Sequence, residues 1–170
     1  AELIFEDCRV PKENLIGKEG QGFKIAMTAL DGARIGVAAQ ALGIAERAFQ
    51  ESVKYMKERV QFGKPIAALQ GLQWYISDMT VKIECARWMI FRAAWLKISG
   101  QPYTKEAAIA KLNASETATF VTNLALQIHG GYGYMKDYPL ERMYRDAKIT
   151  EIYEGTSEIH KVVIARAALR

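Results

Sequence analysis

The sequence predicts an all-α protein, an antiparallel four-helix bundle with a short extended segment at its N-terminus. Apolar residues recur at helical spacing through three long stretches, each of which can therefore bury one face. Segments with glycine or proline separate these stretches, and no region is rich in strand-like alternation. Short connections make neighbouring helices antiparallel, which is the arrangement of a bundle.

The first helix is predicted over residues 22–59, and the breaker at residues 62–65, which contains Gly63 and Pro65, stops it. Its interior glycines, Gly32, Gly36 and Gly43, each cost about 1 kcal/mol relative to alanine. We therefore expect close packing or the approach of a ligand at these glycines.

The second helix is predicted from about Leu69 to Ser99, where apolar residues step by three and four along a bundle seam. Thr104 is the expected N-cap of a third helix, which ends at Gly130 and Gly131.

Two shorter helices are predicted after an irregular segment. One lies around Leu140 to Asp146, and the last starts after Gly155. The chain begins with alanine and an extended-looking segment, so we expect it to continue from something larger.

The composition is that of one globular domain. The 170 residues are 50% apolar and 25% charged, which supports a hydrophobic core. No run of about 18 apolar residues occurs, so no membrane insertion is expected. The net charge of +4 is spread among acidic neighbours, which favours a mixed solvated surface over nucleic-acid binding and also suits an anionic, phosphate-bearing ligand. Cys8 and Cys85 lie far apart, so we expect no disulfide and no metal site, as in a reducing compartment.

Glu154 is the first candidate for chemistry. It stands directly before Gly155 and a helix start, with Ile152 and Tyr153 beside it. One interpretation is that Glu154 and Thr156 only cap the last helix. The alternative is a desolvated carboxylate, which is a stronger base toward a weak carbon acid.

Three further groups of residues have two interpretations each. The glycine-rich segment 127–133 is either a helix C-cap or a backbone approach to a phosphate, and His129 within it is expected to be structural. Arg59 is either a partner of the helix dipole or a diphosphate ligand. Asp31 and Arg34, three residues apart, are either an ion pair within the helix or contacts to a polar ligand.

Taken in order along the chain, several segments resemble one known family over essentially the whole sequence. These segments are Val10 to Gly17, Gly20 to Phe23, Leu30 to Gly36, Arg59 to Pro65, Gln127 to Tyr134, Arg142 to Lys148 and Ile152 to Ile159. Together they strongly resemble the C-terminal part of the acyl-CoA dehydrogenases, closest to the short-chain, butyryl-CoA type.

The resemblance implies a specific reaction. Members bind FAD and oxidise an acyl-CoA thioester to the trans-2-enoyl-CoA. A carboxylate removes the α-proton, the β-hydrogen leaves as hydride to the flavin, and electrons pass to an electron-transferring flavoprotein. The resemblance also implies a homotetramer, a dimer of dimers, in the bacterial cytoplasm or the mitochondrial matrix.

The resemblance assigns roles residue by residue. Glu154 matches the catalytic base, and Gly155 lies beside the thioester; Asp31, Gly32, Ala33 and Arg34 match the segment facing the CoA portion. FAD contacts, some of them to the cofactor of a neighbouring subunit, are expected at Arg59, Gln61, Phe62, Gln70, Gln127, Ile128, His129, Gly130, Gly131, Thr156, Ser157 and Glu158. In the isovaleryl and long-chain branches the base lies instead at the position of Ala33, where this sequence has no carboxylate.

The match also departs from the family, because members have an N-terminal helical domain and a middle β-domain ahead of this region. We expect residues 1–17 to be the tail of that β-domain with its linker and residues 18–170 to be the C-terminal helical domain. We therefore expect the chain alone to have negligible activity. Two other functions stay open: a catalytically silent helical module for oligomerisation, and a relative of the acyl-CoA oxidases.

Overall fold

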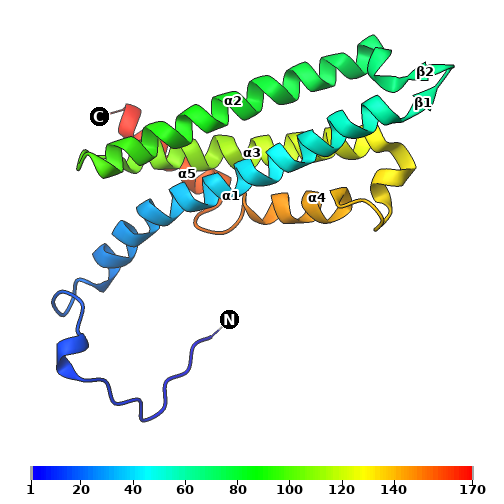
Figure 1. The fold of residues 1–170 in the computed structure, drawn as a ribbon. Helices are drawn as coiled ribbons and strands as arrows, with labels where there is room; N and C mark the ends of the chain where they lie inside the picture. The colour runs from blue at the N-terminus through cyan, green and yellow to red at the C-terminus, as the bar shows by residue number, and fades with distance from the viewer. Residues whose placement is uncertain (1, 170) are drawn as a thin grey trace.

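The computed structural model describes residues 2–169, and helices make up most of this range (Figure 1). Its long helices are α1 (Gly22–Glu58), α2 (Gln70–Ile98) and α3 (Thr104–His129), and its short ones are α4 (Leu140–Ile149) and α5 (Ser157–Ala168). Single 3-10 turns occur at η1 (Lys12–Asn14), η2 (Ile66–Ala68) and η3 (Gly130–Tyr134), and two short strands are β1 (Val60–Gln61) and β2 (Lys64–Pro65). The predicted all-α class is confirmed.

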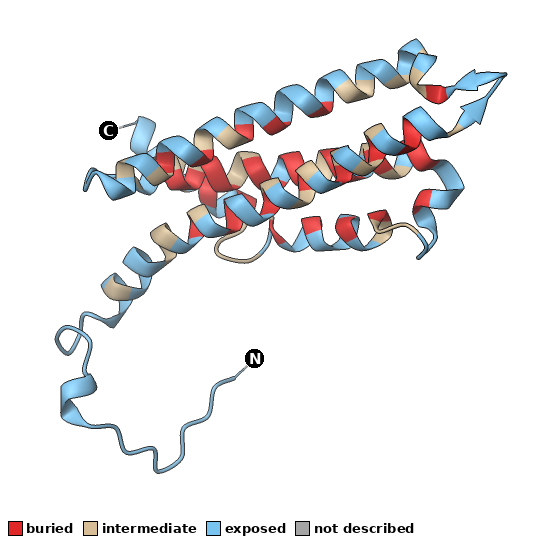
Figure 2. Ribbon diagram, in the orientation of Figure 1, coloured by how far each residue is buried: buried red, intermediate tan, exposed pale blue. Residues whose placement is uncertain are grey.

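Helix α3 is the centre of the arrangement, because α1, α2, α4 and α5 all pack against it. Figure 1 shows α1, α2 and α3 running side by side, with α4 next to α3 and the N-terminal segment leading away from the helices. Residues 2–24 are all exposed and contain no strand (Figure 2). Within the described range, no helix combines the length and the apolar character that crossing a membrane requires.

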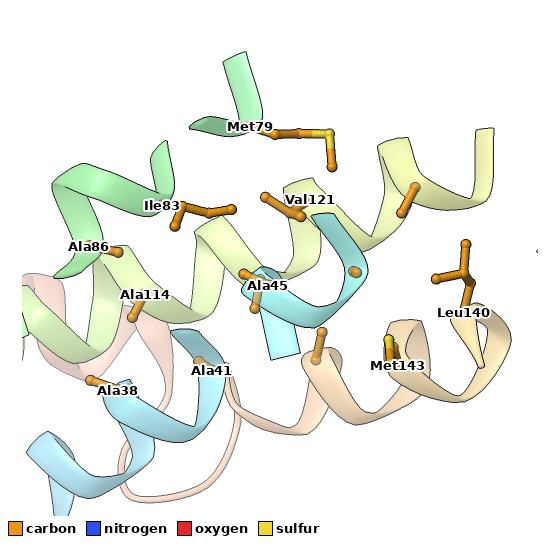
Figure 3. Packing of buried hydrophobic residues seen from close by; sticks show 14 of the residues in the cluster. Ala38, Ala41, Ala45, Met79, Ile83, Ala86, Ala114, Val121, Leu140 and Met143 are labelled. Atoms are coloured by element: carbon orange, nitrogen blue, oxygen red, sulfur yellow. The ribbon is translucent and has the colours of Figure 1, made fainter. Parts of the chain in front are cut away.

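The core between the long helices is built largely from alanine. Figure 3 shows Ala41 and Ala45 of α1 in one cluster with Ala114 and Val121 of α3 and Ile83 of α2. Four of these side chains are fully buried, with relative exposures of 0%: Ala41, Ala45, Ala114 and Val121. Small side chains let two helix backbones approach closely, so this alanine face explains why α1 and α3 make the most extensive helix contact of the fold.

The observed helix ends agree with the predicted ones to within a few residues, but the predicted cap at Thr104 is wrong. Tyr103 occupies the N-cap position of α3. The Thr104 hydroxyl donates instead to Oδ2 of Asp31 at 2.6 Å. The C-cap prediction is confirmed, since Gly130 ends α3 with a φ of +58°.

A small hairpin joins α1 to α2 where the sequence indicated only a breaker. Val60 pairs with Pro65 and Gln61 with Lys64. Phe62 and Gly63, with φ values of +53° and +76°, form the two-residue turn. Strands of two residues are too short to show alternation, so the sequence pattern could not predict them.

Only one of the three interior glycines of α1 is closely packed. A Cβ atom on Gly32 would lie 2.9 Å from Nζ of Lys97, whereas Gly36 and Gly43 face open space. The expectation of close packing therefore holds at Gly32, whereas at Gly36 and Gly43 the approach of a ligand stays the prediction.

Candidate active site

Glu154 lies in the turn between α4 and α5, in a backbone conformation that few side chains adopt. Its φ is +56°, and that of the following Gly155 is +98°. A left-handed conformation costs a residue other than glycine about 1–2 kcal/mol, so neighbouring contacts must hold Glu154 in place. Helix α5 begins at Ser157 with Thr156 at the N-cap position, and Thr156 makes no side-chain capping bond to the helix backbone. Glu154 therefore precedes the helix and does not cap it.

Two cationic side chains from different helices hold this turn. Nε of Arg34, on α1, donates to the carbonyl oxygen of Glu154 at 3.4 Å. Nζ of Lys111, on α3, donates to the next carbonyl oxygen, that of Gly155, at 2.7 Å. The backbone N–H of Ser157 closes the turn by donating to the carbonyl oxygen of Glu151 at 3.1 Å. Charge-assisted hydrogen bonds are short and strong, which describes the 2.7 Å bond from Lys111, whereas the 3.4 Å bond from Arg34 is long and weaker.

The Glu154 side chain is half-buried, and its Oε2 atom is buried without a hydrogen-bond partner among the described residues. A carboxylate oxygen that accepts no hydrogen bond keeps its lone pairs available for a proton. A buried carboxylate oxygen with free lone pairs suits a base that acts where water is excluded.

Arg34 forms the ion pair that the sequence predicted, and its contact with a polar ligand stays a prediction. Its Nη1 atom pairs with Oδ1 of Asp31 at 2.7 Å, so the ion pair within the helix exists. The same guanidinium reaches the Glu154 turn, and Asp31 also accepts the Thr104 hydroxyl. Asp31 therefore orients Arg34 toward the turn.

Two buried titratable residues lie under the turn, and sequence reasoning assigned a role to neither. Lys111 and His160 are both fully buried. Burial, with Arg34 as the next cause, lowers the pKa of Lys111 to about 8. Burial also lowers the pKa of His160 to about 4, with Lys111 as the next cause. A signal for Lys111 existed, because it shares the buried helical face of Ala107, Ala114 and Ser115.

A separate cavity of about 680 Å³ lies where α1 and α3 end. Much of its lining consists of residues for which the resemblance implies FAD contacts: Arg59, Gln61, Gln127, Ile128, His129, Gly130 and Gly131. Phe62 and Gln70 do not line it; both are exposed, Phe62 at the tip of the hairpin and Gln70 at the first position of α2.

His129 belongs to the aromatic wall of this cavity. Its ring stacks on Tyr55 at a centroid distance of 4.1 Å, and its Nδ1 atom lies 2.8 Å from the carbonyl oxygen of Ala125. Burial lowers the pKa of His129, which keeps the ring neutral at physiological pH. The guanidinium of Arg59 lies 5.5 Å from the Tyr132 ring centroid, and Arg59 forms no ion pair within residues 2–169. Its charge is thus available to an anionic ligand.

The residues with implied cofactor contacts fall into two places on one chain. Arg34, on α1, contacts the Glu154 turn, and Arg59, at the C-cap position of α1, lines the cavity. The two arginines lie 25 positions apart in the sequence. A rise of about 1.5 Å per residue puts their backbones about 37 Å apart. Thr156, Ser157 and Glu158 lie with the turn, and the glycine-rich segment lies with the cavity.

Known proteins with similar sequence and structure share one family. The model of the acyl-CoA dehydrogenase C-terminal domain matches residues 20–169. The acryloyl-CoA reductase (NADH) of Anaerotignum propionicum is 75% identical over all 170 residues, which make up 43% of that protein.

Two solved structures have the same fold. The butyryl-CoA dehydrogenase of Megasphaera elsdenii has a TM-score of 0.97 at 55% identity, over 98% of this chain and 44% of that one. A chain in a structure of the electron transferring flavoprotein of Acidaminococcus fermentans has a TM-score of 0.97 at 61% identity, over 98% of this chain and 44% of that one. The chain thus spans less than half the length of these proteins. It belongs to the acyl-CoA dehydrogenase family of flavin-dependent oxidoreductases and matches the C-terminal domain of that family.

Proposed function

We propose that this chain is the C-terminal domain of a FAD-dependent dehydrogenase that oxidises short-chain acyl-CoA thioesters to trans-2-enoyl-CoA. In this proposal Glu154 takes the α-proton, and residues 1–17 are the tail of a preceding β-domain. Bound flavin supplies the acceptor for the hydride that leaves the β-carbon. The observation that carries the proposal is the unpartnered, buried Oε2 atom of Glu154 in a turn held by Arg34 and Lys111.

The physical demand on the base explains this arrangement. The α-proton of a thioester is far less acidic than a carboxylic acid, so a water-exposed carboxylate removes it poorly. The Oε2 atom of Glu154 is buried and accepts no hydrogen bond from the described residues, so its lone pairs are free to take the proton. Arg34 and Lys111 hold the backbone that follows Glu154, which lowers the entropy cost of aligning the base with the α-carbon.

The two separate groups of cofactor residues support an oligomer. We propose that Thr156 to Glu158 at the start of α5 contact the FAD of their own subunit. Arg59, Gln61 and the backbone of Gly130 and Gly131 then contact the FAD of a neighbouring subunit, with Phe62 and Gln70 beside them. A separation of about 37 Å along α1 supports the assignment of the two groups to different FAD molecules. The assembly proposed is a homotetramer built as a dimer of dimers.

The partner that receives the electrons is proposed from a structural relative. A chain 61% identical to this one occurs in a structure of an electron transferring flavoprotein, which supports such a protein as the acceptor. A dehydrogenase would reduce this acceptor, whereas an oxidase relative would release hydrogen peroxide during turnover. Measuring peroxide under air with butyryl-CoA separates the two.

The reverse reaction is a second candidate, because the relative with 75% identity is an acryloyl-CoA reductase. Reduction would use the same residues in the opposite sense, with protonated Glu154 donating its proton to the α-carbon. Assays of the full-length protein in both directions, butyryl-CoA oxidation and NADH-driven acryloyl-CoA reduction, show which one it carries out faster.

The test of the base is Glu154→Gln in the full-length protein. Turnover should fall by at least about a thousandfold while bound flavin is retained, because glutamine keeps the size of the side chain but cannot accept the proton. Glu116→Gln is the matched control, since Glu116 is exposed on α3 and has only a 3.9 Å contact with Lys161. Unchanged turnover in Glu154→Gln would end the catalytic proposal in favour of a silent oligomerisation module.

A further inference from the structure

Lys111 is the largest fully buried side chain of the described residues, and its ammonium has no carboxylate within ion-pair distance. Its one hydrogen bond goes from Nζ to the carbonyl oxygen of Gly155 at 2.7 Å. A buried ammonium without a paired carboxylate costs free energy, because it loses its water shell. The lowered pKa of Lys111 reports this cost.

The hydrogen bond from Lys111 holds the backbone directly after Glu154, the proposed base. Glu154 and Gly155 are both left-handed, and their two carbonyl groups are held by two cations from two helices. Arg34 fixes the peptide that joins Glu154 to Gly155, and Lys111 fixes the next peptide. Restraining these two consecutive peptides limits the directions in which the Glu154 side chain can leave the turn.

We propose that Lys111 is a positioning residue for catalysis, whose buried ammonium grips the Gly155 carbonyl and holds Glu154 in its reactive orientation. This inference rests on the proposed role of Glu154 as the base. Lys111 does not touch the reacting atoms, so it should act on the rate of the chemical step and leave substrate affinity unchanged.

The ammonium has charged or titratable neighbours on α1, in the α4–α5 turn and on α5. Arg34 faces it from α1, Glu151 and Glu154 face it from the α4–α5 turn, and Glu158 and His160 face it from α5. Their combined effect with burial leaves the pKa of Lys111 at about 8, so the group is charged at neutral pH and loses its charge as the pH rises through 8. A neutral amine donates a weaker hydrogen bond than an ammonium, so the contact between Lys111 and the Gly155 carbonyl weakens above pH 8.

The experiment measures kcat and KM of the full-length flavoprotein from pH 6 to 9.5, together with flavin content. In the unmodified protein kcat should fall by about tenfold as the pH rises through 8, with KM unchanged. Lys111→Met, which keeps the length without the charge, should have this low kcat at every pH. Lys111→Arg, which stays charged, should lose the fall above pH 8.

The inference is overturned if Lys111→Met matches the unmodified kcat at pH 7, or if its rate still falls above pH 8. If Lys111→Met does not fold, the Lys111→Arg profile decides alone, because an unchanged fall near pH 8 would exclude Lys111 as its source. Glu154→Gln, measured in parallel, separates the two proposals. Full turnover in that variant defeats the base itself, whereas its inactivity beside a fully active Lys111→Met defeats only the role of Lys111.

Discussion

Arg34 and Glu154 meet across 120 residues of sequence, with Nε of the arginine 3.4 Å from the carbonyl oxygen of the glutamate. The contact brings the first long helix to the turn that precedes the last helix. Because the same guanidinium pairs with Asp31, any change at Asp31 is transmitted to the backbone of the proposed base.

Replacing Arg34 by methionine should lower the free energy of unfolding by about 2–3 kcal/mol, because Asp31 is left with a half-buried charge and only the Thr104 hydroxyl as partner. The double variant Asp31→Asn/Arg34→Met should recover about 1 kcal/mol or more of this loss. Urea denaturation of the four proteins of the cycle measures both values.

Arg47→Met on the same helix is the matched control for this cycle. Its partner Glu51 forms an ion pair in which the arginine side chain is 58% exposed, so the loss should stay below about 1 kcal/mol. Equal losses at Arg34 and Arg47 would contradict a special role for the Arg34 contact.

Gly155→Ala should lower the free energy of unfolding by about 1–3 kcal/mol. Its φ of +98° strains any residue with a Cβ, and the new atom would lie 3.3 Å from the His160 ring. Gly43→Ala should instead stabilise the protein by up to about 1 kcal/mol, since Gly43 is helical and faces open space. Chemical denaturation of both variants gives the comparison, and a stabilising Gly155→Ala would refute the strained turn.

His160 should make the fold sensitive to acid. Its pKa is about 4 in the folded protein against an ordinary value of 6.5, so below pH 6.5 the unfolded chain binds a proton that the folded chain excludes. Stability is therefore complete above pH 6.5 and is lost as the pH falls toward 4, by about 3 kcal/mol from this residue. Lys111 adds nothing in this window, because it is protonated in both states.

Unfolding free energies measured between pH 4 and 7 test this effect. His160→Gln should flatten the curve over that range, and the remaining slope should include the contribution of His129, whose pKa is also lowered. A curve that His160→Gln leaves unchanged would show that His160 is not the source.

Ala41→Leu should cost about 1–3 kcal/mol, because Ala41 is fully buried in the alanine face of α1 and the extra atoms have no space. Ala39→Leu, on the exposed side of the same helix, should change stability by less than about 0.5 kcal/mol. Thermal unfolding of the pair checks the packing, and equal melting temperatures would contradict it.

These 170 residues by themselves should show negligible dehydrogenase activity, since they span less than half the length of their relatives and the rest of that length is expected to complete the flavin site. The measurement is the flavin absorbance after butyryl-CoA is added to the purified chain mixed with FAD. Loss of the flavin absorbance would contradict this prediction, because it would show that these 170 residues alone suffice to reduce FAD with butyryl-CoA.

Local patterns in the sequence were enough to predict the helices. Apolar spacing placed α1, α2 and α3 within one residue or so at most of their ends, because hydrogen bonds within a helix depend on neighbouring residues. The Thr104 cap failed for the opposite reason: its hydroxyl bonds to Asp31, which lies 73 residues away. The two-residue strands of the hairpin were missed because so short a pairing leaves no pattern.

The sequence by itself determined that the chain is helical and that its order of motifs is that of the acyl-CoA dehydrogenases, with Glu154 as the matching carboxylate. Only the tertiary structure decided how Glu154 is held. The hydrogen bonds of Arg34 and Lys111 to this turn join residues 120 and 44 positions apart, and the two groups of residues with proposed FAD contacts lie in separate places of the fold. Such contacts depend on how α1, α3 and α5 pack, and helical spacing specifies which face of a helix is buried without specifying which residue meets it.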